Sequence, residues 1–144
     1  MTSSRTPCRS AIGALLFSVL FAGCGAGGPT LFDVSGTVTY KGQPVQDLQV
    51  FFVPEVGRPS TAITDAQGHF ALKYTSDQKG ALAGKHRVYV EYVPPTMDEQ
   101  IAIQEGKGRY PDGVKEVLAK YGDREKTPLT FDIKKSQQLD LRFD

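Results

Sequence analysis

The side chains that could take part in chemistry are few and widely spaced. The chain has two histidines, His69 and His86, and two cysteines, Cys8 and Cys24, in 144 residues. A zinc site takes Cys, His or carboxylate ligands gathered in one place, and a disulfide framework needs cysteines spread through the folded part, whereas none follows Cys24. Alternation of apolar residues predicts that His69 faces solvent and that His86 is a satisfied, half-buried ring at a strand start. We therefore expect neither a metal site nor a disulfide framework.

Motifs that mark common catalytic sites are missing from the sequence. No Gly-x-Ser-x-Gly elbow presents a nucleophilic serine, and no glycine-rich loop ending in Gly-Lys-Ser/Thr could hold phosphates. The turn at 65–68 offers one carboxylate, Asp65, where calcium takes about six to eight oxygen ligands. We therefore predict a protein that is not an enzyme and that carries no cofactor.

Two tyrosines remain as candidates for ligand binding. Tyr110 and Tyr121 bracket a helical signal, and Arg109 and Arg124 lie near them in the sequence. Exposed aromatic rings there could stack on a sugar or a partner peptide; alternatively, the rings pin this segment to the rest of the fold. Because loops on a rigid scaffold often carry function, the segment 94–126 is where we would look for a ligand site.

Composition narrows the class of protein further. The 17 basic and 16 acidic residues nearly balance, and a nucleic-acid binder usually carries a clear basic excess. A hydrophobic content of 40% argues against global disorder. Valine, threonine, tyrosine and phenylalanine, punctuated by 15 Gly and 9 Pro, favour short strands and turns. We expect a β-rich globular domain that does not bind nucleic acid.

The N-terminal segment has the pattern of an export signal. Residues 1–10 carry Arg5 and Arg9 with no acidic residue, and the uncharged run 11–22 ends at Gly23 and Cys24. A membrane-spanning helix needs roughly 20 apolar residues, so this run is too short to span. We predict a signal peptide at 1–23.

The end of the apolar run, Leu20-Phe21-Ala22-Gly23-Cys24, resembles the lipobox of bacterial lipoproteins. The resemblance implies that Cys24 receives lipid and becomes the first residue of the mature chain, although Phe21 departs from the usual aliphatic residue. Stable anchoring takes two or more acyl chains. The glycine-rich stretch at 24–31 then predicts a flexible tether. We expect a domain outside the cytoplasm on a bacterial membrane; a secreted protein or an uncleaved anchor are the alternatives.

Period-two alternation dominates the remainder of the chain. One apolar face per strand predicts two sheets that cover each other. Within the first strand Gly36 takes an inward position, which predicts the close approach of another backbone. The seven predicted strands lie at 32–40, 48–53, 61–64, 69–74, 85–92, 129–133 and 139–143.

The segment 94–126 breaks this rhythm and is too long for a structureless loop in a compact domain. Thr96 and Glu99 have the spacing of a capping box ahead of a first helical turn. Asp112 could cap a second helix that ends near Gly122. We predict a partly helical insertion between the last strands.

Five segments in order give the domain at 32–144 its resemblance to the carboxypeptidase regulatory-like domain, a transthyretin-like (prealbumin-like) fold. The nearest kind is the small lipoproteins abundant in Planctomycetes. Ala83 and His86 stand where the family often has proline and an aromatic residue. The resemblance implies an all-β fold, a seven-stranded antiparallel Greek-key β-sandwich. The five segments are VSGTVTYKGQPV at 34–45, VFFVP at 50–54, TDAQGHF at 64–70, AGKHRV at 83–88 and YGDREKTPLTFDI at 121–133.

The resemblance does not carry an enzyme activity into this chain. In metallocarboxypeptidases the domain is an accessory, and neither histidine here begins a His-x-x-Glu motif. The hydroxyisourate hydrolases of similar fold end in a Tyr-Arg-Gly-Ser tail, whereas this chain ends Asp-Leu-Arg-Phe-Asp. We expect a non-catalytic envelope lipoprotein with a structural or interaction domain, whose partners are the membrane and an unidentified envelope protein or glycan. The alternatives are a carbohydrate- or peptide-binding module that uses 94–126, and a transthyretin-like hydrolase.

Overall fold

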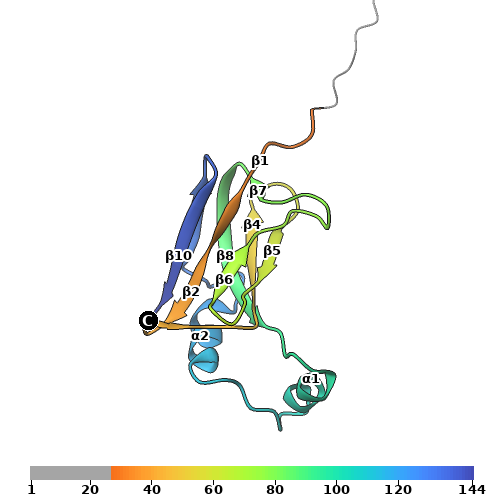
Figure 1. Cartoon of the computed structure of the whole chain (residues 1–144), viewed down its shortest axis with the longest axis vertical. Coiled ribbons are helices and arrows are strands. Elements are labelled where there is room, and N and C mark those ends of the chain that lie inside the picture. Colours follow the sequence, from red (N-terminus) through yellow and green to blue (C-terminus); the bar gives the residue numbers. More distant parts are fainter. Residues whose placement is uncertain (1–26) are drawn as a thin grey trace, which may run out of the picture.

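A computed structural model describes residues 27–144, so the expected signal peptide and Cys24 lie outside the described residues. The described chain is rich in β-strand, with few helices, and forms two principal sheets that face each other (Figure 1). The strands are β1 (Leu31–Phe32), β2 (Val34–Tyr40), β3 (Gln43–Pro44), β4 (Leu48–Pro54), β5 (Ser60–Ile63), β6 (His69–Ala71), β7 (Ala81–Leu82), β8 (Gly84–Tyr92), β9 (Thr130–Ile133) and β10 (Gln137–Phe143). The two helices are α1 (Met97–Gln104) and α2 (Val114–Tyr121).

One sheet has the strand order β5-β4-β8-β9 and is antiparallel throughout. Val50 pairs with Val90 and Phe52 with Val88, so the apolar positions of β4 and β8 share one face. All four of these side chains are fully buried. The alternation predicted for these strands is therefore confirmed, and its physical cause is the burial of one face against the other sheet.

The second sheet has the order β10-β2-β3, with β6 also paired to β2. Here the expectation of a fully antiparallel sandwich is wrong, because β10 runs parallel to β2, with Leu141 opposite Val38 and Phe143 opposite Tyr40. The chain leaves the first sheet after β9 and enters the second at β10, where it runs in the same direction as β2. Period-two patterning specifies which face of a strand is buried but not the direction of its neighbour.

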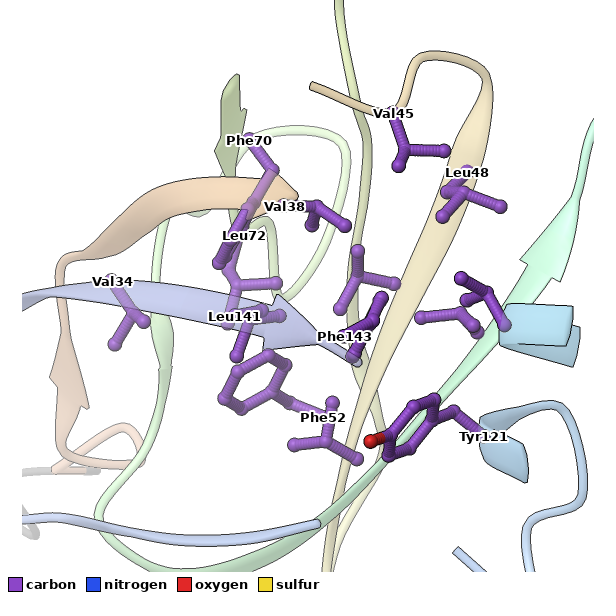
Figure 2. Packing of buried hydrophobic residues seen from close by; sticks show 14 of the residues in the cluster. Val34, Val38, Val45, Leu48, Phe52, Phe70, Leu72, Tyr121, Leu141 and Phe143 are labelled. Carbon is purple, nitrogen blue, oxygen red and sulfur yellow. The ribbon is translucent and has the colours of Figure 1, made fainter. Parts of the chain in front are cut away.

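The core lies between these sheets and includes aromatic as well as aliphatic side chains (Figure 2). Phe52 packs near Phe70 and Phe131, at ring-centroid distances of 6.3 and 5.9 Å. Each buried side chain of this size contributes roughly 1.5–3 kcal/mol. The fold is therefore held by apolar contact between the sheets, as expected for a domain whose described residues include no cysteine.

Three two-residue strands lie where the sequence pattern indicated turns, loops or one continuous strand. Asp33 separates β1 from β2, which were predicted as one strand at 32–40. Strand β1 pairs with β7, which lies between the predicted strands at 69–74 and 85–92. Beside this pair, Lys73 exchanges two backbone hydrogen bonds with Thr61 of β5, at 2.9 Å each. Backbone pairing therefore joins the two sheets along this side. Segments of two residues are too short to show a period in the sequence, which is why they were not predicted.

Gly36 confirms the predicted close approach of a second backbone. A Cβ atom built at this position would lie 1.9 Å from the carbonyl oxygen of Leu139 in β10 and 3.0 Å from the ring of Phe70. Only a residue without a side chain leaves room for β10 beside β2 at this point.

The predicted insertion contains both helices, but only one of them packs into the core. Thr96 accepts a hydrogen bond from the Glu99 amide at the start of α1, so this predicted cap is confirmed. Asp112 does not cap α2; the cap position is Gly113, at φ 80°, without a side-chain hydrogen bond. Helix α2 buries one face against the sandwich, whereas α1 buries no residue fully. Within 27–144, neither helix has the length and apolar character needed to cross a membrane.

Candidate functional site

The two histidines lie in opposite sheets and form no common site. His69 on β6 has a side chain that is 61% exposed, and its Nδ1 lies 3.6 Å from a carboxylate oxygen of Asp65. His86 on β8 is 2% exposed. In the described part of the chain, no group of three or more His, Cys, Asp or Glu side chains could hold a metal ion.

His86 is more deeply buried than the predicted half-buried ring, and only one of its nitrogens is satisfied. Its Nδ1 lies 2.9 Å from the Gly84 carbonyl oxygen. Because a carbonyl only accepts, Nδ1 carries the proton. The other nitrogen, Nε2, is buried without a hydrogen-bond partner. Burial lowers the pKa of His86, and this effect outweighs the opposing effects of the Gly84 carbonyl and Asp132. Burial therefore favours the neutral form of the ring.

A cleft of about 530 Å³ lies beside His86 along β4, β8 and β9. Its charged lining residues are Glu55, Lys85, Arg87, Arg124 and Asp132. Arg87 donates to Glu125 at 3.1 Å, and Lys134 lies 2.9 Å from Asp132. Because charges of both signs line this cleft and several are paired, it has no strong preference for a charged ligand.

Tyr121, a predicted ligand-binding residue, lies in the core instead of on the surface. It is 6% exposed, and its ring stacks on Phe143 with a centroid distance of 4.4 Å (Figure 2). This burial argues against ligand stacking by Tyr121 and agrees with the alternative, in which the ring pins the insertion to the rest of the fold. Val114 and Val117 share its buried face of α2, so the helical spacing of these three residues contained the signal.

Tyr110, the other predicted residue, is half-buried between the two helices in the chain. Its ring lies 5.6 Å from that of Tyr92, the last residue of β8, at an interplanar angle of 57°. The ammonium of Lys115 lies 5.8 Å from the centroid of Tyr110. Tyr110 thus connects the insertion to the sandwich and also lines a groove. The structure does not bring Tyr110 and Tyr121 together into one binding site.

The groove beside Tyr110 has a volume of about 520 Å³ and lies between β8, α1 and α2. Its apolar lining comes from Val90, Pro94, Ile103 and Leu118, and its aromatic lining from Tyr92 and Tyr110. Its polar lining comes from Glu91, Gln100, Gln104 and Asp123. Aromatic rings with a few convergent polar groups are typical of a binding groove.

Sequence reasoning missed the part of Tyr92 in this groove. The period-two pattern of the strand at 85–92 indicates only that Tyr92 shares a face with Val88 and Val90. Burial raises the pKa of Tyr92, and the nearby carboxylates of Glu99 and Asp47 raise it further. Because Asp47 precedes β4 and Glu99 belongs to α1, the groove combines residues that are far apart in the sequence. No local pattern could have indicated this grouping.

Comparison with known proteins gives little further information about the site. No family model matches the chain, and no curated protein matches it significantly. Among solved structures, the chain is similar to a DUF3823 family protein from Parabacteroides merdae, with 15% sequence identity and a TM-score of 0.43. The match covers 80% of this chain and 46% of that protein, so the chain spans less than half of its length.

Proposed function

We propose that this protein is a non-catalytic bacterial lipoprotein. Its Cys24 carries the lipid, and its sandwich serves structure or interaction on the outer side of a membrane. We further propose that the domain is of the carboxypeptidase regulatory-like, prealbumin-like kind, with its seven longer strands in Greek-key order. The observation that carries the proposal is the small-small-Cys sequence Ala22-Gly23-Cys24 at the end of an uncharged run.

The position of the first strand supports an interaction role. Strand β1 lies at one end of the sandwich, and α1 and α2 lie at the other (Figure 1). An anchor ahead of β1 would therefore hold the groove between β8 and the helices away from the bilayer. Such an arrangement would present the groove to proteins or polymers of the envelope.

The anchor is tested by metabolic labelling with a fatty-acid probe, followed by membrane fractionation of the full chain. Cys24→Ser should abolish labelling and release the protein from membranes, because two acyl chains provide the stable attachment. Cys8→Ser is the matched control and should label normally. A Cys24→Ser protein that still labels and stays in membranes would reject the anchor.

A second candidate function is ligand binding by the insertion, with a carbohydrate or a peptide as ligand. The observation in its favour is the groove, where Tyr92 and Tyr110 meet beside two glutamines. Replacing Tyr110 by Leu should weaken binding of any ligand of the groove, because it removes the aromatic surface. Binding that survives this change would put the site elsewhere.

A further inference from the structure

The charged side chains that line the groove between β8, α1 and α2 are acidic, and one cation lies nearby, the ammonium of Lys115 at 5.8 Å from the Tyr110 centroid. Glu91 and Asp123 line the groove, and no Lys or Arg does. Glu99 and Asp47 lie close enough to Tyr92 to act on its hydroxyl.

Most of these carboxylates are available to a ligand. Within 27–144, no cationic group lies within 4.0 Å of Asp47, Glu91 or Glu99. Only Asp123 has a partner, the ammonium of Lys126 at 3.3 Å. The cleft beside His86 differs, because both positive and negative side chains line it. Of the groove and the cleft beside His86, only the groove has lining charges that favour a cation.

The aromatic lining suits the same kind of ligand. The face of a tyrosine ring attracts a Lys or Arg cation within about 6 Å of its centroid. Tyr110 already has the ammonium of Lys115 at 5.8 Å. The apolar residues of the groove, Val90, Ile103 and Leu118, would contact the aliphatic part of a long basic side chain.

We propose that this groove binds a basic peptide segment of a partner protein, with Lys or Arg side chains placed against Tyr92 and Tyr110 and paired with Glu91 and Glu99. The inference rests on the proposed interaction role and specifies its class of partner. Gln100 and Gln104 of α1 offer donors and acceptors for the peptide backbone. A neutral glycan would use the rings and the glutamines but would leave the carboxylates without a counter-charge.

The test measures fluorescence anisotropy of a labelled lysine-rich peptide with the full chain in detergent micelles. A glutamate-rich peptide of equal length is the reference probe, and a glycan array tests the other class of ligand. The double variant Glu91→Gln with Glu99→Gln removes two charges at constant side-chain size. Its matched control, Glu55→Gln with Asp77→Asn, removes two exposed charges outside the groove.

We expect the lysine-rich peptide to bind and the glutamate-rich peptide not to bind. The groove variant should weaken binding by about fivefold to tenfold at low salt, as expected for two surface ion pairs. The control variant should change it less than twofold. Higher salt should reduce the difference between the two variants, since the interaction is screened.

Three results would overturn the inference: no binding of the lysine-rich peptide, equal weakening by the groove and control variants, or binding of neutral glycans without binding of the peptide. None of these outcomes bears on lipidation, because fatty-acid labelling at Cys24 is measured independently. A failed anchor with retained peptide binding would in turn reject the proposed envelope attachment and leave the groove assignment intact.

Discussion

Replacing Gly36 by alanine tests the pairing of β2 with β10 at its tightest point. The backbone of Gly36 does not have a positive φ, so alanine is excluded there by lack of space alone. Where space is available, a Gly→Ala change stabilises a protein by about 0.4–1 kcal/mol, because the unfolded chain loses freedom. The sign of the effect therefore reports whether β10 lies where the structure puts it.

The size of the effect follows from the contacts. The new Cβ would lie 1.9 Å from the Leu139 oxygen and 2.8 Å from its carbonyl carbon, whereas ordinary contacts lie at 3.4–4 Å. Strand β10 would have to retreat by roughly 1.5 Å, a distance that removes much of the attraction between packed atoms. Leu141 and Phe143, both buried, would move with it. Overpacking of this kind costs about 1–3 kcal/mol, so we expect a net destabilisation of about 2 kcal/mol.

Urea unfolding followed by far-UV circular dichroism and tyrosine fluorescence measures this change, since the chain has six tyrosines and no tryptophan. For a domain of this size, the loss corresponds to a decrease in Tm of roughly 8 °C. Ser35→Ala, on the same strand, is the control and should change stability by less than about 0.5 kcal/mol. An unchanged or more stable Gly36→Ala protein would refute the close approach of β10 to β2 at this position.

Three further predictions concern buried groups. Because the pKa of His86 lies below its usual 6.5, the unfolded state binds more protons, and the free energy of unfolding should fall as pH decreases below 6.5. Urea titrations of His86→Gln should show no such dependence of the free energy of unfolding on pH between pH 7 and 5. The control His69→Gln, at an exposed position, should keep that dependence. Tyr121→Ala should lower the free energy of unfolding by about 3 kcal/mol, because the stack on Phe143 is lost. Tyr121→Phe keeps the ring and should lower it by less than about 1 kcal/mol. Equal losses for the two variants in thermal unfolding would argue against the stacked geometry. Thr127→Val should cost about 1 kcal/mol in chemical denaturation, because its hydroxyl donates to a β8 carbonyl at 2.6 Å; an unchanged midpoint would contradict that bond.

The sequence predicted the longer strands because burial of one face imposes a period of two. Each of the seven predicted strands has a counterpart in the structure, with ends that differ by a few residues. The inward position of Gly36 and the cap at Thr96 were also readable, since both depend on a local pattern. The cap at Asp112 was wrong because the backbone at Gly113 adopts a left-handed conformation that side-chain type alone did not indicate.

The candidate site depended on information that no local segment contains. Tyr110 was chosen from its place in the insertion and does line the groove, whereas Tyr121 was chosen on the same ground and is buried. The two tyrosines differ because Tyr121 lies on the buried face of α2, together with Val117, and this face is set by the packing of the helix.

The sequence by itself determined the β-rich class, the positions of the longer strands and the expectation of an anchor at Cys24. These follow from local periodicity and composition, which act over a few residues. Only the tertiary structure decided that β10 runs parallel to β2, that His86 is fully buried and that Tyr92 and Tyr110 meet in one groove. The reason is that strand direction and side-chain proximity arise from contacts between segments far apart in the chain, whose partners are chosen by the packing of the whole core.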